Sequence, residues 1–364
     1  MDDENTGQYV QEVCFDQLAN QHFYTIQVFS ENRPSFYIAE IFFQNHNNKT
    51  MLGFNQTHLC NLLTDSKCRI IPQQVELLKT LIPENRREVM RWPGGTVSME
   101  YTIGQLGHNA AETKSGKWKR YGVDPLEVFL YVSKLMGWKI LVVINGYTLF
   151  KNFADKYTYE AESILQLNLI QKIKDAGLPI AGVEIGNELQ IYCSVRGQYI
   201  NNKEAFNRDI DKYFTVTEEM NEAIRWNFPD LYTGACFVTP KAALANGRDG
   251  RWWQVFKNTK CDALIVHHYE DDPNKIVWQR NLSNMVNEIS GKLNKQCWLT
   301  ESNWNFGLNN TNAAYASAIK SPELYKAYQS AWADMVNTAG FDIACYHRIA
   351  GDKKENHPYN FIQM

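Results

Sequence analysis

The stretch Lys139-Ile140-Leu141-Val142-Val143-Ile144 holds five consecutive apolar side chains. A strand with one face in water alternates apolar and polar residues, whereas a strand that is apolar throughout is buried on both faces. Strands of this second kind belong to parallel sheets whose faces are covered by helices. The stretch therefore predicts an α/β protein with a parallel sheet.

Seven further short apolar runs lie on either side of this stretch, with room for helices between most of them. In chain order the eight runs are Met51–Asn55, Val89–Pro93, Trp138–Asn145, Ile180–Glu188, Leu231–Val238, Ala263–Tyr269, Gln296–Glu301 and Phe341–His347. Eight strands that alternate with helices are typical of a (β/α)₈ barrel, the TIM barrel, and this is the predicted fold. A doubly wound open sheet is the structural alternative.

Helix boundary signals fall between these runs. Asp124-Pro125 supplies an N-cap residue and a proline at the first helical position, and Gly137 predicts where that helix ends. Ser321-Pro322 and Gly340 frame a later helix in the same way. These signals support the alternation of strands and helices.

The chain is predicted to have three parts. Residues 1–48 contain two alternating segments, 23–29 and 35–43, and are expected to form an N-terminal appendage of antiparallel β-strands. Residues 49–350 are expected to form the catalytic barrel. Residues 351–364 are mostly polar and are expected to form a C-terminal tail.

Charge and hydropathy narrow the classes of partner. The chain of 364 residues has 37 Lys and Arg against 40 Asp and Glu. It therefore lacks the excess of positive charge that would predict nucleic-acid binding. No apolar run reaches the length of a membrane span.

Residues 1–5 lack the basic and apolar regions of a signal peptide. We nevertheless expect a secreted, periplasmic or lysosome-like location, with the signal not present in this chain, and we make no prediction of oligomeric state.

Eight cysteines occur without the paired spacing of a zinc site. Cys60 and Cys68 are close enough in sequence to bridge one loop. Five others lie in or near predicted strands, where a free cysteine packs as a small apolar side chain: Cys193, Cys236, Cys261, Cys297 and Cys345. Cysteine usage therefore leaves the redox compartment open.

Polar residues at the ends of the predicted strands are the candidate site residues, because barrel enzymes carry their chemistry at the C-terminal ends of strands. Glu188 ends the fourth run and Glu301 the seventh, so the two carboxylates face each other nearly across the barrel mouth. Cleavage of a glycosidic bond uses such a pair, with one carboxyl group protonated and the other ionised. The pair predicts a glycoside hydrolase.

The motifs around these residues resemble a known group of enzymes. Gly186-Asn187-Glu188 together with Thr300-Glu301-Ser302 resembles the signature of clan A glycoside hydrolases. Residues 91–95, Arg-Trp-Pro-Gly-Gly, resemble the strand-two motif of arabinofuranosidase-type members. His267-His268-Tyr269 resembles the strand-six motif of arabinofuranosidases and heparanase-like glucuronidases. The eighth predicted strand departs from the clan pattern. Strand eight of clan members often ends in Trp, whereas in this chain it ends in Tyr346-His347-Arg348.

This resemblance implies a retaining hydrolase that acts on a poly- or oligosaccharide, with no cofactor and no metal. It implies that Glu188 is the general acid/base, Glu301 the nucleophile, and Asn187 the residue that binds the sugar hydroxyl beside the anomeric carbon. It also implies that Arg91 lies beside the nucleophile and that Tyr269 donates a hydrogen bond to it. The other predicted substrate-binding residues are Asn145, His267, Asn303, Trp304 and Arg348.

Three alternatives remain open. His267 and His268, with the acidic residues 270–272, have the chemistry of a divalent metal site, which would make the chain a metal-dependent hydrolase. A non-catalytic carbohydrate-binding barrel is the second alternative. Transglycosylation is the third, because a retaining mechanism permits either acceptor. Glu184, inside the fourth run, is expected to be a core carboxylate outside catalysis.

Overall fold

The computed structural model divides the chain into two compact units, Met1–Lys49 and Thr50–Met364. The structure describes residues 10–18, 21–28, 39–43, 50–55, 71–81, 88–95, 98, 126–188, 203–237, 250–270, 275–304 and 322–347. Several predictions lie outside these residues: the Cys60–Cys68 bridge, the core placement of Cys193, the role of Arg348 and the tail 351–364.

The first unit contains one small antiparallel sheet in the order β1-β2-β3. Its strands are β1 (Val10–Leu18), β2 (Gln21–Val28) and β3 (Ala39–Phe43). The central strand β2 pairs with both neighbours, so that Tyr24 aligns with Phe15 on one side and with Ile41 on the other.

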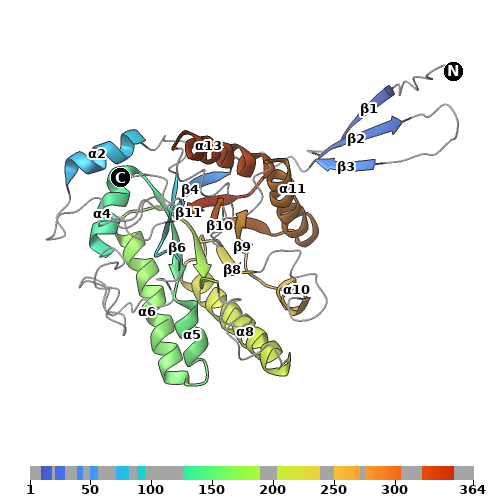
Figure 1. Cartoon of the computed structure of the whole chain (residues 1–364). Helices are drawn as coiled ribbons and strands as arrows, with labels where there is room; N and C mark the ends of the chain where they lie inside the picture. Colours follow the sequence, from blue (N-terminus) through green and yellow to red (C-terminus); the bar gives the residue numbers. More distant parts are fainter. Residues whose placement is uncertain are drawn as a thin grey trace, which may run out of the picture. The chain divides into compact units, whose positions relative to one another are not determined.

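The second unit is a closed barrel of eight parallel strands (Figure 1). In chain order the strands are β4 (Met51–Asn55), β5 (Val89–Trp92), β6 (Lys139–Ile144), β7 (Ile180–Ile185), β8 (Thr233–Cys236), β9 (Ala263–Glu270), β10 (Gln296–Trp304) and β11 (Ile343–His347). Pairing between β11 and β4 closes the ring. The predicted (β/α)₈ barrel is confirmed, and the open-sheet alternative is wrong because no edge strand is left unpaired within this sheet.

Helices surround the strands in Figure 1. They are α2 (Pro72–Leu81), α4 (Leu126–Met136), α5 (Gly146–Asn152), α6 (Lys156–Asp175), α8 (Lys203–Asn227), α10 (Gly250–Phe256), α11 (Lys275–Val286), the π-helical turn η4 (Asn287–Gly291) and α13 (Pro322–Ala339). In the described part of the chain, none of them has the length and apolar content needed to cross a membrane.

Glycines end several of these helices, as predicted. Gly137 follows α4 with φ 70°, and Gly340 follows α13 with φ 84°. A side chain at such a φ would clash with the following carbonyl oxygen, so glycine is the residue that turns the chain out of a helix most readily. These stops return the chain to the next strand of the barrel.

The core has two layers. Side chains inside the barrel form one cluster, which consists of Val89, Leu141, Ala263, Ile265, Trp298, Ile343 and Cys345. A larger cluster fills the space between the strands and the helices and includes Trp92, Trp138, Trp252 and Trp278. Among the described residues, the tryptophans are therefore largely core residues. The cysteines described within the barrel unit, at positions 236, 261, 297 and 345, are buried free thiols, as the sequence predicted.

Trp298 determines which residues its neighbours in the barrel interior can be. A Cβ atom at Gly182 would lie 2.4 Å from the Trp298 ring, and one at Gly234 would lie 2.8 Å from it. Both distances are shorter than side chains tolerate, so the two glycines make room for the indole.

We expect Trp298→Ala to lower the free energy of unfolding by about 3–5 kcal/mol, because it leaves a cavity inside the barrel. Chemical denaturation followed by circular dichroism measures this change. Trp226→Ala is the matched control, since Trp226 is 88% exposed on α8, and it should change stability by no more than about 0.5 kcal/mol. Equal losses in the two variants would contradict a packing role for Trp298.

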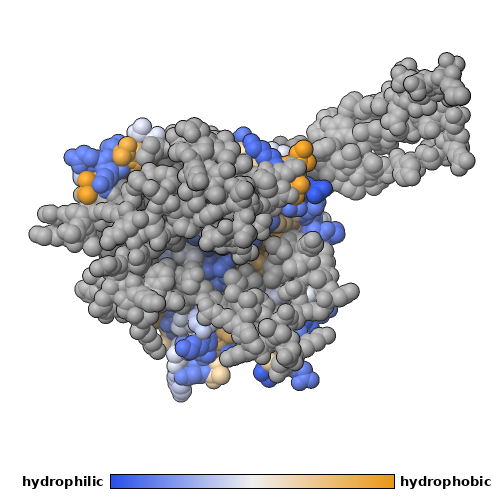
Figure 2. Space-filling view, viewed as in Figure 1, coloured by the Kyte–Doolittle hydropathy of each residue, from blue (hydrophilic) through white to orange (hydrophobic). Residues whose placement is uncertain are grey.

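The described part of the face in Figure 2 is mostly hydrophilic, with small apolar patches over α2 and beside α11. Leu77 on α2 and Ile276 on α11 are exposed apolar residues. Apolar side chains scattered in this way are normal on protein surfaces, so these patches indicate no partner.

Candidate active site

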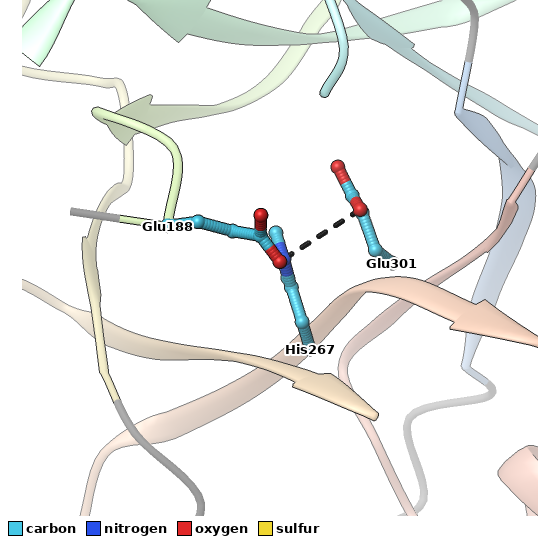
Figure 3. Close-up of side chains that lie close together, drawn as sticks. All are labelled: Glu188, His267 and Glu301. Carbon is cyan, nitrogen blue, oxygen red and sulfur yellow. Dashed lines mark hydrogen bonds and ion pairs between the residues drawn. The ribbon is translucent and has the colours of Figure 1, made fainter. Parts of the chain in front are cut away.

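Six polar side chains meet at the C-terminal ends of the strands. Glu184, Asn187 and Glu188 come from β7 and the turn after it, whereas Arg91, His267 and Glu301 come from β5, β9 and β10. Figure 3 shows Glu188, His267 and Glu301 pointing toward one another from three separate elements. One ligand atom from each of these three residues lies within 4.8 Å of the other two.

The turn after β7 directs Glu188 into the barrel mouth. Gly186 has φ 88° and Glu188 has φ 44°, a left-handed conformation that is unfavourable for a residue with a side chain. The Cys236 thiol donates a hydrogen bond to the Gly186 carbonyl over 3.0 Å, and the Tyr213 hydroxyl donates to the Ile185 carbonyl over 3.1 Å. Strained backbone of this kind is concentrated at functional sites, where the surrounding structure holds it in place.

A β-bulge in β10 brings two successive residues to the same histidine. Leu299 pairs with Val266 and Glu301 pairs with His267, so Thr300 is an extra residue on β10. Successive residues of a regular strand point to opposite faces. At this bulge the Thr300 hydroxyl lies 3.0 Å from His267 Nε2, while Glu301 Oε2 lies 3.7 Å from His267 Nδ1.

Arg91 connects three acidic or amide side chains beneath the mouth. Its Nε and Nη2 atoms donate to the two carboxylate oxygens of Glu184 over 2.7 and 2.5 Å. Nη1 donates to Glu301 Oε1 over 2.7 Å, and Nη2 also donates to Asn187 Oδ1 over 2.7 Å. Arg91 and Glu184 are fully buried, and such a buried charge is tolerated only when it is paired and hydrogen-bonded.

Glu184 contributes to the site in a way that sequence reasoning missed. It is a core carboxylate, but its two hydrogen bonds to Arg91 set the direction in which the guanidinium meets Glu301. The available signal was a pair of opposite charges, Arg91 and Glu184, inside two otherwise apolar strands.

Glu301 is held as an ionised carboxylate. Arg91 donates to Oε1, the Tyr269 hydroxyl donates to Oε2 over 2.7 Å, and His347 Nδ1 lies 3.9 Å from Oε2. Burial by itself raises the pKa of Glu301, but the charges of His267, His347 and Arg91 and the Tyr269 hydrogen bond lower the pKa well below its usual range. Glu301 is therefore charged at neutral pH.

Glu188 has a different environment. Its side chain is 22% exposed, against 5% for Glu301, and its Oε1 lies 3.0 Å from His267 Nδ1. Burial lowers the pKa of His267, but the charges of Glu301 and Glu188 outweigh burial and raise it above the usual value. The structure therefore places His267 between the two carboxylates.

Asn187 is oriented by Arg91. Its Oδ1 accepts a hydrogen bond from the Arg91 guanidinium, so the amide oxygen faces Arg91 and the N–H₂ group points the other way. This Nδ2 atom is buried, and among the described residues it has no hydrogen-bond partner. It is a donor that a bound molecule can satisfy.

The remaining predicted site residues have the following positions. Asn145 Oδ1 accepts from the Thr148 amide and so caps α5, and Asn303 Nδ2 donates to the His347 carbonyl over 2.5 Å. Trp304 is the last residue of β10, and its side chain lies outside the described part of the structure, as does all of Arg348. Substrate contact by these four residues stays a prediction.

His347 is a further site residue that the sequence analysis did not select. It ends β11, lies 3.9 Å from Glu301 and interacts with Asn55 at the end of β4, whose Nδ2 is 2.8 Å from His347 Nδ1. Its place at a strand end was a visible signal, but the neighbouring Arg348 was selected instead.

This barrel has the fold of glycoside hydrolases, and the resemblance to that class is confirmed at the level of fold. Two matching structures are β-glucuronidases from Bacteroides uniformis, one of them covalently bound to cyclophellitol-6-carboxylate aziridine. Their identity to this chain is 7% and 9%, each with a TM-score of 0.50, and each match covers 90% of this chain and 36% of the other.

An α-L-arabinofuranosidase from Thermotoga maritima, in complex with arabinose, also matches, with 13% identity and a TM-score of 0.46. That match covers 82% of this chain and 64% of the arabinofuranosidase. The chain thus spans about a third of the length of the glucuronidases and under two thirds of the arabinofuranosidase. No protein-family model and no curated protein sequence matches the chain.

Proposed function

We propose that the chain is a retaining O-glycoside hydrolase that cleaves a poly- or oligosaccharide by double displacement. The observation that carries this proposal is the close approach of Glu188 and Glu301, because a carboxylate oxygen of one lies within 4.8 Å of a carboxylate oxygen of the other. Retaining glycosidases hold their carboxyl groups about 5–5.5 Å apart, whereas inverting enzymes need about 6.5–9.5 Å to admit a water molecule. The close approach supports retention.

The environments of the two carboxylates support different roles. A nucleophile must be ionised before the substrate arrives, and Arg91 and Tyr269 keep Glu301 in that state. A general acid/base must exchange protons with the leaving group and with water. Glu188 is the more exposed of the two and contacts the titratable side chain of His267.

The reaction then has two steps. In the first, a Glu301 oxygen attacks the anomeric carbon while Glu188 gives its proton to the departing oxygen, so the glycosidic bond breaks and a glycosyl ester forms. In the second, Glu188 takes a proton from a water molecule, which attacks the anomeric carbon and releases Glu301. Asn187 Nδ2, buried without a partner among the described residues, donates to the sugar hydroxyl beside that carbon.

The matching glucuronidases support a carbohydrate substrate over the metal-dependent hydrolase. The carboxylate pair and its ionising hydrogen bonds also favour an enzyme over a non-catalytic binding barrel, which would not need an ionised Glu301. Transglycosylation uses the same first step and differs only in the acceptor.

A panel of aryl glycosides and polysaccharides tests this proposal. We expect hydrolysis of at least one aryl glycoside, and proton NMR should show that the first-formed sugar keeps the anomeric configuration of the substrate. The double variant Glu188→Gln/Glu301→Gln, purified identically, controls for contaminating glycosidases. A first product of opposite configuration would refute the retaining mechanism, and no turnover across the whole panel would refute the proposed function.

A further inference from the structure

Glu188, His267 and Glu301, here called the carboxylate–histidine cluster, have the composition and spacing of a metal site. His267 Nδ1 lies 3.0 Å from Glu188 Oε1 and 3.7 Å from Glu301 Oε2 (Figure 3). A zinc ion with bonds of about 2.0–2.2 Å in tetrahedral geometry separates its ligand atoms by about 3.3 Å. These two distances lie on either side of that value, and the third separation, between the Glu188 and Glu301 ligand atoms, is within 4.8 Å. Side-chain movements of about an ångström would therefore bring all three ligand atoms to one ion.

The Thr300 hydroxyl can anchor the His267 ring while a metal takes the place of the proton that Nδ1 donates to Glu188. His267 Nε2 lies 3.0 Å from the Thr300 hydroxyl. When Nε2–H donates to this oxygen, loss of the Nδ1 proton leaves a lone pair that faces the two carboxylates. Metal-binding histidines commonly use one ring nitrogen in this way and anchor the ring through the other.

The charge of the site favours a cation. Glu184, Glu188 and Glu301 carry three negative charges when ionised, and Arg91 supplies one positive charge. The net charge of this group of described residues is −1 when His267 is protonated, the form that its raised pKa favours, and −2 when His267 is neutral. A divalent ion that takes the place of the His267 proton brings the charge of the group to zero. Buried charge without compensation is strongly unfavourable, so the site has a physical reason to take such an ion.

The cluster is also open to an ion from solvent, because the Glu188 side chain is 22% exposed. Its donor set is one nitrogen and carboxylate oxygens. Such a mixed set favours zinc and its first-row neighbours, whereas magnesium and calcium prefer oxygen ligands alone.

We propose that the carboxylate–histidine cluster binds one zinc ion and that this ion blocks the enzyme by occupying both catalytic carboxylates. Glu188 coordinated to zinc has no proton to give the leaving group. Glu301 coordinated to zinc shares a lone pair with the ion, which weakens it as a nucleophile, and the ion stands where the sugar must bind. The inhibition rests on the proposed glycosidase function, whereas the binding of zinc rests on the geometry alone.

Isothermal titration calorimetry of the metal-stripped full-length protein with zinc chloride tests the binding. We expect one zinc site that depends on the cluster, and removal of a direct ligand in His267→Gln or Glu188→Gln should weaken it by at least about 100-fold, since even the loss of a supporting contact costs 10–100-fold. His268→Gln is the matched control, because His268 precedes Tyr269 on the same strand but is no part of the cluster. The zinc affinity of His268→Gln should match that of the wild type. Glu188→Gln alters a partly exposed side chain, so it keeps the test valid even if His267→Gln fails to fold.

The outcomes separate this inference from the proposed function. Zinc bound equally well by the wild type, His267→Gln and Glu188→Gln would overturn the cluster as its site, as would loss of binding in His268→Gln. Cluster-dependent binding in a protein without glycosidase activity would support the zinc site and refute the proposed function. Inhibition of hydrolysis over the zinc range that titrates the site would support both. Hydrolysis that appears only with zinc would overturn the inhibitory role and favour the metal-dependent hydrolase.

Discussion

Replacement of Glu301 by glutamine is expected to lower turnover by at least about 10⁴-fold, the scale of effect seen when a catalytic nucleophile is removed. An amide cannot form the glycosyl ester, and it cannot carry the negative charge that stabilises positive charge on the sugar in the transition state. Steady-state kinetics on the best aryl glycoside measures the change. Incubation of the wild type with a slow-releasing fluorinated glycoside should add one glycosyl mass to a peptide containing Glu301.

The variant is expected to remain folded, because Arg91 keeps both hydrogen bonds to Glu184 when Glu301 changes. Glu76→Gln on α2 is the control, since the Glu76 side chain is 70% exposed. Turnover of Glu301→Gln within tenfold of this control would rule out Glu301 as the nucleophile. A label on another carboxylate would identify the group that acts instead.

Replacement of Glu188 by alanine is expected to give a result that depends on the leaving group. Natural substrates need protonation of the departing oxygen, so turnover on them should fall by about 10²–10⁴-fold, the usual contribution of general acid catalysis. Dinitrophenyl glycosides depart without protonation and should still form the glycosyl ester at an appreciable rate. Rapid kinetics should then show a burst of phenolate followed by slow release of the ester.

Added azide separates the two glutamates by the configuration of the product. In Glu188→Ala the ester on Glu301 remains, and azide should attack it to give a glycosyl azide of retained configuration. In Glu301→Ala azide would replace the nucleophile itself and give a glycosyl azide of inverted configuration. Identification of the azide products by NMR checks both statements. An inverted product from Glu188→Ala would mean that the two roles are reversed.

Much of the fold was predictable because its signals are local. The apolar run 139–144 indicates burial on both faces, and Gly137 indicates a helix stop, whatever the rest of the chain does. Strand ends in a barrel share one edge, so Glu188 and Glu301 could be named as a pair before their distance was known. The lengths of individual elements were less predictable: β10 runs to Trp304, three residues beyond the apolar run, because its pairing with β9 continues to Glu270.

The sequence by itself determined that eight buried strands alternate with helices and that two carboxylates end the fourth and seventh apolar runs, since periodicity and residue type are properties of the chain. Tertiary structure alone decided how the carboxylates differ. The bulge at Thr300, the Arg91–Glu184 pair and the place of His267 between Glu188 and Glu301 all join residues far apart in sequence. Distances and local charge exist only once the barrel closes, and those quantities keep Glu301 ionised.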